Sequence, residues 1–116
     1  MVSSKTSKHD RLNREIASKL KGMDLILINH EYKNYKNTKV VGEIDCFAYR
    51  KSVAFVIETK TNYTNKLRRK ALSQMGRMED KFLPRYEREN GIKFDKLVWL
   101  LVTSSGVQNE GVSYRR

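Results

Sequence analysis

The sequence predicts an α/β fold in which a mixed β-sheet lies between helices. Several short apolar runs are bounded by polar residues and have the length of buried strands. Two other stretches repeat apolar residues at spacings of three and four, which is typical of amphipathic helices. The 116 residues are enough for one domain with a modest core. The predicted element order is α-β-β-β-α-β, in a single domain over residues 1–116.

The first helix is expected over residues 8–21, because apolar residues recur there at helical spacing. These residues are Leu12, Ile16 and Leu20. Glu15 lies on the flank of this stripe, where a glutamate can face either solvent or a functional site. Residues 1–7 are polar, and we expect a loose tail there. The next apolar run predicts a buried strand over residues 24–29.

The second and third strands are expected over residues 40–49 and 53–60. The short polar connection between them predicts antiparallel pairing. Strand alternation predicts one face with Glu43, Asp45, Phe47 and Tyr49, and an opposite face with Ile44, Cys46 and Ala48. Glu58 and Lys60 are two positions apart and therefore share a face of the third strand.

A long helix is predicted to follow Thr64 and to be interrupted at Pro84, with a short continuation beyond it. Its apolar stripe comprises Leu67, Ala71, Met75, Met78 and Phe82. Gln74 lies near the centre of that stripe, and a buried amide needs hydrogen-bond partners. The run over residues 96–103 is the most apolar in the chain and predicts a well-covered strand. The polar residues 104–116 are expected to form a loose tail.

Charge is the strongest compositional signal, since 24 Lys and Arg against 13 Asp and Glu give a net charge of +11. Such an excess attracts polyanions, and nucleic acid is the first candidate. An anionic membrane surface is the alternative, although no segment approaches the roughly 20 apolar residues of a membrane span. The N-terminal lysines precede no apolar segment, so we expect an intracellular protein without a secretory signal. Cys46 is the only cysteine, which excludes an intramolecular disulfide, and we expect it to be a small buried hydrophobe.

Two basic regions are candidates for contact with nucleic acid. Residues 30–39 combine tyrosines with lysines, which could stack on bases and meet phosphates, or could form a solvated hairpin loop. Cations at the start of the second helix oppose the helix dipole, which indicates either an anionic ligand or a solvated face. The candidate residues are Lys33, Lys36, Lys39, Lys66, Arg68, Arg69 and Lys70.

Two acids on neighbouring predicted strands are candidate metal ligands. Asp45 and Glu58 could bracket Mg²⁺, or Mn²⁺ as a substitute, because such ions prefer carboxylate oxygens. The carbonyl of Thr59 and the carboxylate of Glu15 could add ligands, and Lys60 could orient the attacking water. The only histidines, at positions 9 and 30, are far apart, so we expect oxygen ligands alone. The alternative is that both acids are exposed on an amphipathic hairpin.

The residues Gly42-Glu43-Ile44-Asp45, followed by Val56-Ile57-Glu58-Thr59-Lys60, resemble the signature of the PD-(D/E)XK nuclease superfamily. Size, element order and the early helical glutamate are most similar to the small basic Holliday-junction resolvases of archaea and their viruses. The family's proline before the aspartate is Ile44 here.

The resemblance implies a restriction-endonuclease-like core and a homodimer that cuts branched DNA with Mg²⁺. It assigns metal binding to Asp45 and Glu58, and water activation or phosphate contact to Lys60. Glu15 or Glu43 would be the accessory acid, and Gln74 resembles a glutamine of the following helix in some members. Nucleases of the same fold that act on single-stranded, flap or nicked DNA, and a non-catalytic DNA-binding module, remain alternatives. The sheet face around Phe47 or Trp99 is a candidate dimer surface.

Overall fold

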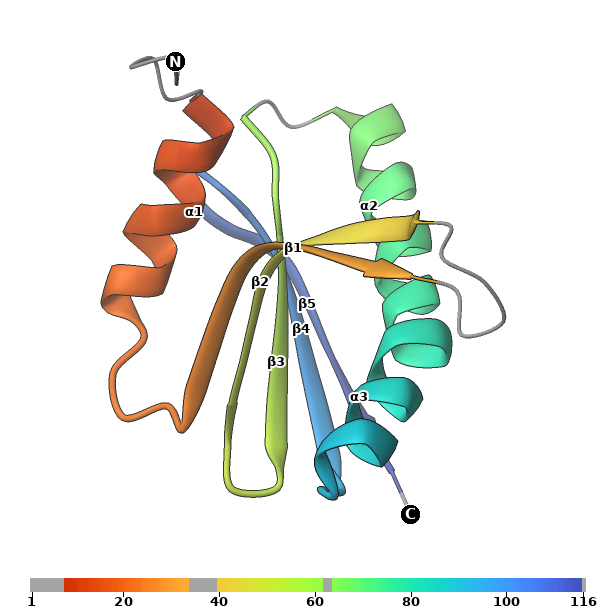
Figure 1. The fold of residues 1–116 in the computed structure, drawn as a ribbon. Helices are drawn as coiled ribbons and strands as arrows, with labels where there is room; N and C mark the ends of the chain where they lie inside the picture. Colours follow the sequence, from red (N-terminus) through yellow and green to blue (C-terminus); the bar gives the residue numbers. More distant parts are fainter. Residues whose placement is uncertain (1–7, 34–39, 62–63, 116) are drawn as a thin grey trace, which may run out of the picture.

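A five-stranded sheet lies between helices in the structure, a computed structural model that describes residues 8–33, 40–61 and 64–115 (Figure 1). The strands lie side by side in chain order. The elements are α1 (Lys8–Lys19), β1 (Leu25–Lys33), β2 (Val40–Arg50), β3 (Val53–Thr59), α2 (Asn65–Arg77), the π-helical turn η1 (Met78–Phe82), α3 (Leu83–Asn90), β4 (Lys96–Thr103) and β5 (Gly106–Tyr114).

The sheet is mixed, because β3 and β4 run parallel while the other neighbouring pairs are antiparallel. The helical segment from α2 to α3 connects the parallel pair, as a parallel connection requires. The predicted α/β class with a mixed sheet is therefore confirmed. Parallel pairing places Glu58 opposite Leu101, so β3 and β4 end at the same edge of the sheet.

Helices cover both faces of the sheet (Figure 1). On one face, α1 packs through Ile16 and Leu20 against Cys46, Ile57 and Val102. On the other face, the helical segment from α2 to α3 covers a larger cluster. That cluster comprises Ile44, Phe47, Ala54, Val56, Met78, Phe82, Leu83, Phe94 and Leu97. None of the helices in the described ranges is long and apolar enough to cross a membrane.

The regular α-helix is interrupted just before Pro84, as predicted, but by a π turn and not by a break in the helical segment, and the predicted short continuation is α3. The segment continues from α2 through η1 into α3, with Pro84 in the first turn of α3. A proline ring normally clashes with the carbonyl four residues earlier. Just before Pro84 the helix adopts a π turn, in which Leu83 N–H donates to Met78 O, five residues back. This wider turn accommodates the proline without ending the helix.

The prediction of a loose tail over residues 104–116 is wrong, because residues 106–114 form the edge strand β5. A turn at Ser104 and Ser105 reverses the chain, and β5 pairs with β4 along its length. The half-buried Trp99 lies opposite Gly111, and a Cβ added at Gly111 would meet the Trp99 ring at 2.1 Å. The tail is therefore ordered by pairing and by the tryptophan, not by its own apolar content.

The candidate dimer surface around Phe47 or Trp99 is not an exposed face. Phe47 is fully buried at the centre of an aromatic group with Phe82, Tyr86 and Phe94. Its ring has edge-to-face contacts with all three, an arrangement that aromatic rings favour.

Candidate active site

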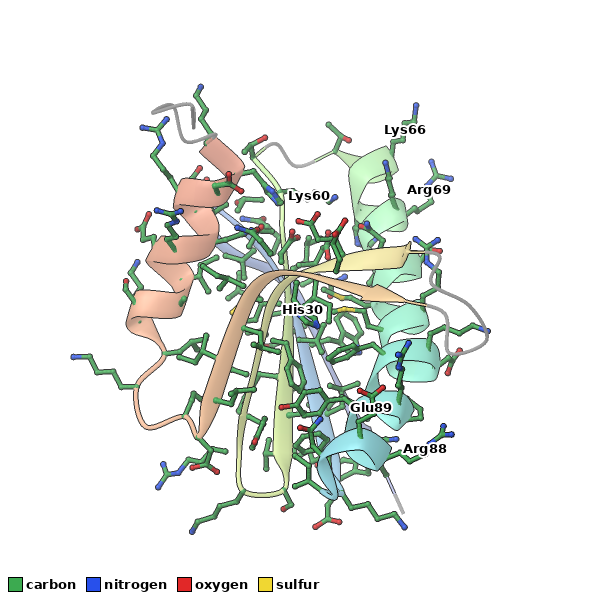
Figure 2. All side chains as sticks on the ribbon, in the orientation of Figure 1. His30, Lys60, Lys66, Arg69, Arg88 and Glu89 are labelled. Atoms are coloured by element: carbon green, nitrogen blue, oxygen red, sulfur yellow. The ribbon has the colours of Figure 1, made fainter. Side chains whose placement is uncertain are left out.

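An ion pair lies at the end of β3, next to α2. Lys60 Nζ lies 3.3 Å from Glu58 Oε1 and 3.5 Å from Gln74 Oε1. Glu58 is only 3% exposed, and the Lys60 side chain is 17% exposed. Figure 2 shows Lys60 at the end of the sheet near the start of α2. The prediction that Glu58 and Lys60 share a face is confirmed. The Gln74 amide faces Lys60, which supplies the hydrogen-bond partner that a polar group on the apolar stripe needs.

Asp45 approaches this pair from β2. One carboxylate oxygen, Oδ2, accepts a hydrogen bond from Thr59 N at 2.9 Å. The other, Oδ1, lies 3.3 Å from His9 Nε2. Asp45 is 4% exposed, so the alternative of an exposed hairpin charge does not hold for either acid.

β1 and β2 both bend partway along their length (Figure 1). The pairing of Ile28 with Cys46 and of His30 with Ile44 places Asn29 opposite Asp45. Asn29 has φ 50°, a left-handed conformation that asparagine tolerates better than most residues. Alternation is broken here: Ile44 packs with Phe47 on the α2 side instead of sharing the face of Cys46. The predicted division of the two faces of β2 is wrong at this point.

The first helix contributes two side chains that the sequence analysis did not assign to the site. Asn13 is fully buried; its Nδ2 donates to Asn29 Oδ1 at 2.7 Å, and its Oδ1 accepts from Thr59 Oγ1. His9 Nε2 lies 2.9 Å from Thr59 O and 2.8 Å from Thr59 Oγ1. His9, Asn13, Ile16 and Leu20 follow each other at intervals of four, three and four, so one helical face carries both the site residues and the packing residues. That spacing could have identified His9 and Asn13.

Neither candidate for the accessory acid joins the site. Glu15 is exposed and pairs with Lys19 at 3.2 Å, within the helix. Its helical position points it away from the face that holds Asn13. Glu43 is exposed on β2, opposite Glu31. One or the other was expected to be the accessory acid of a metal site, and neither lies with Asp45, Glu58 and Lys60.

Burial and charge act together on Glu58. Burial is the larger cause and the neighbouring Asp45 carboxylate the next, and they raise the pKa of Glu58 from 4.5 to about 8 against the opposing effect of Lys60. The second carboxylate oxygen, Glu58 Oε2, is buried without a hydrogen-bond partner among the described residues. Buried polar atoms rarely lack partners, and a carboxyl group in this environment favours its protonated form. Burial likewise raises the pKa of Cys46 to about 11, which agrees with an unreactive buried thiol.

Asp45 and Glu58 supply carboxylate oxygens, the donor atoms that Mg²⁺ prefers. Two carboxylates lie beside each other, and one has an unpartnered oxygen. Within the described ranges, no group of three or more His, Cys, Asp and Glu side chains converges, so a backbone carbonyl would have to take part. Thr59 O, which lies 2.9 Å from His9 Nε2, is the carbonyl that the sequence analysis predicted for this role.

The basic candidates divide into three groups. Lys66, Arg68, Arg69 and Lys70 are exposed at the start of α2, and Figure 2 shows Lys66 and Arg69 pointing outward near the end of the sheet that holds Lys60. Lys36 and Lys39 lie outside the described residues, as does the side chain of Lys33. A third group was not predicted: Lys8 and Arg11 line a groove together with Leu12, Glu15, Thr61 and Ser104.

Comparison of the sequence with protein-family models and with curated proteins finds no match. Membership of the PD-(D/E)XK superfamily therefore stays a prediction from the motif.

Proposed function

We propose that this chain is a metal-dependent endodeoxyribonuclease of the PD-(D/E)XK type, with a restriction-endonuclease-like core. The observation that carries the proposal is the buried group of Asp45, Glu58 and Lys60, in which Glu58 Oε2 has no partner among the described residues. An ion pair that served only stability would need its remaining lone pairs satisfied. An arrangement that holds a carboxylate oxygen ready for a cation is better explained by catalysis.

The roles of the residues follow from their contacts. Asp45, Glu58 and the Thr59 carbonyl would hold the cation, which supplies positive charge to the phosphate and lowers the pKa of a water molecule. Lys60, held by Glu58 and Gln74, has an ammonium group placed to orient the attacking water or to neutralise charge on the phosphate. Gln74 fixes the direction of the lysine chain and thus acts as a positioning residue.

The surroundings suit a nucleic-acid backbone. One groove has two cations and one acid among its lining residues, which are Lys8, Arg11, Leu12, Glu15, Thr61 and Ser104. The basic start of α2 flanks the end of the sheet that holds Lys60. Phosphate contacts of this kind position a duplex without reading its sequence. Following the resemblance, we propose branched DNA as the substrate, cut by a homodimer with one site per subunit.

The test is cleavage of labelled DNAs in Mg²⁺ and in Mn²⁺, using a four-way junction, a flap, a single strand, a nicked duplex and a linear duplex. Lys60→Ala is assayed in parallel. We expect paired cuts in the junction and a loss of about 10²–10⁴-fold in rate for the variant, with DNA affinity retained.

The outcomes separate the alternatives. Broad cutting that is lost in the variant would keep the site and move the function to a nuclease of the same fold with another substrate. DNA binding without cleavage of any substrate in either metal would contradict the proposal and leave a DNA-binding module.

A further inference from the structure

We infer that a second copy of this chain docks on the part of the sheet that β4 and β5 form on the side of α1. The inference rests on the proposed function for its homodimer, and it adds the surface through which the two copies meet. The surface predicted from the sequence does not serve, because Phe47 is fully buried and Trp99 packs over Gly111.

Strand alternation and register define the side chains of this surface. Leu100 belongs to the apolar cluster that includes Ile16 and Leu20 of α1, so it points to the α1 side. Val98 is two positions away on the same strand and shares that side. Residues directly opposite each other in an antiparallel pair also share a face. We therefore define the β4–β5 face as Val98 and Leu100 of β4 with Val107, Glu110, Val112 and Tyr114 of β5.

The first helix covers this side of the sheet only in part. The cluster that it forms with the sheet includes residues of β1 to β4 and none of β5. Val107, Val112 and Tyr114 are 55%, 50% and 78% exposed, and they are three of the four large apolar side chains that are exposed in the described ranges. Between α1 and β5 lies a groove of about 260 Å³, whose apolar lining includes Leu20 and Val107. Apolar side chains gathered beside a groove are typical of a surface that another molecule covers.

Charge indicates that the other molecule is a second copy. Two chains of net charge +11 repel each other, and they repel least where cations are absent. Residues 97–114 contain no lysine or arginine, and Glu110 is their only charged residue. A nucleic acid would therefore find no cation there.

Cations border the same face, which makes it self-complementary. Lys19 lines the groove, and Lys96 Nζ lies 5.7 Å from the centre of the Tyr114 ring. A two-fold axis places the same patch on both copies, so Glu110 of each copy meets a patch that is bordered by cations.

The free edge of β5 gives an independent argument. Edge strands are commonly protected by lysine or proline, because their unpaired backbone groups can pair with another chain. The nine residues of β5 include neither, although 24 of the 116 residues in the chain are Lys or Arg. The other edge strand, β1, contains Glu31 and Lys33. A copy docked on the β4–β5 face would shield the edge that lacks such protection.

The test is sedimentation equilibrium of the full chain over a range of concentrations at fixed salt, where we expect a monomer–dimer equilibrium. Glu110→Lys places a cation in the face of both copies, and we expect the dimer dissociation constant to rise at least about tenfold. Val112→Ser removes apolar area without a change of charge, and we expect a rise of about tenfold. Both side chains are exposed, so the monomer should fold, and circular dichroism checks this.

Glu31→Lys is the matched control, because it makes the same change of charge at an exposed residue of β1, the opposite edge strand. It should leave the dissociation constant nearly unchanged. Equal weakening by Glu110→Lys and Glu31→Lys would overturn the inference, because it would show only general repulsion. A dimer that neither Glu110→Lys nor Val112→Ser weakens would also overturn it.

Cleavage of the four-way junction separates this inference from the proposed function. A chain that is monomeric at every concentration and still cuts the junction would overturn the inference and leave the nuclease standing. A dimer that is weakened as expected but cuts no DNA would support the β4–β5 face and contradict the proposed function.

Discussion

The environment of Glu58 costs the folded chain free energy. Its carboxyl group is buried, lies beside a second acid, and has one oxygen without a partner among the described residues. Such an environment favours the protonated form and opposes ionisation. A bound cation would reverse this preference, because it stabilises the ionised form. The cost of burying the acid is therefore consistent with a ligand site.

This environment predicts a pH dependence of folding. The pKa of Glu58 is about 8 in the folded chain and 4.5 in its unperturbed state, so between these values only the folded state holds the proton. The free energy of unfolding should therefore fall as pH rises through this window, by up to about 1.4 kcal/mol per pH unit. Glu58→Gln should remove this contribution. Urea denaturation from pH 5 to 8 measures the difference in slope between the two proteins.

Glu15→Gln is the control for that experiment, because it alters an exposed carboxylate on α1. It should leave the slope of the wild type unchanged. Equal slopes for Glu58→Gln and the wild type would show that Glu58 is ionised in the folded chain.

The sequence predicted the residues of β3 better than those of α1. Strand alternation placed Glu58 with Lys60, and helical spacing placed Gln74 toward them. Glu15 was misplaced because it lies about 100° around the helix from the centre of the apolar stripe, whereas Asn13 lies only about 60° from it. The role of Asn13 could not be predicted, because it depends on hydrogen bonds with Asn29 and Thr59, which are close to it only in the folded chain.

At the scale of elements, β5 is held in place by its neighbour β4 more than by burial of its own side chains. Its sequence is mostly polar, and Val107 and Val112 are about half exposed, at 55% and 50%. Pairing with β4 and the packing of Trp99 over Gly111 hold it in place. Sequence patterns detect strands that bury their own side chains, so an edge strand of this kind escapes them. The π turn before Pro84 was not predicted, for a similar reason. It accommodates the proline within a helix, and no pattern of residues in the sequence marks it.

Gly111→Ala tests the role of the tryptophan. The added methyl group would collide with the Trp99 ring, so we expect a loss of about 1–3 kcal/mol in the free energy of unfolding. Gly76→Ala is the matched control, since nothing lies within 4 Å of a Cβ at that exposed position of α2. It should stabilise the chain by about 0.5–1 kcal/mol. Chemical denaturation measures both, and a neutral Gly111→Ala would contradict the packing account.

At the scale of the whole molecule, the charge of +11 is unevenly spread along the chain. Residues 97–114, which cover all but the first residue of β4 and the whole of β5, contain no lysine or arginine. The basic residues lie elsewhere, including the start of α2 and the groove that Lys8 and Arg11 line. A polyanion should therefore approach the end of the sheet that holds Lys60, and not the β5 edge.

This distribution predicts which cations set the salt dependence of DNA binding. Arg69→Ala should reduce the slope of log affinity against log salt by about 0.9 if it neutralises one duplex phosphate. Arg88→Ala is the matched control, because Figure 2 shows Arg88 at the opposite end of the same helical segment. Fluorescence anisotropy at several salt concentrations measures both slopes. Equal losses for the two variants would contradict a DNA path at the start of α2.

The most direct measurement for the central claim is cleavage of a labelled four-way junction by the wild type and by Asp45→Asn, purified in parallel. The variant keeps the size of the side chain and removes the charge that the cation requires. The account predicts cleavage by the wild type that needs a divalent cation and stops with EDTA, no cleavage by the variant, and similar DNA affinity for both. Metal-dependent cleavage by the variant at the wild-type rate would contradict the site.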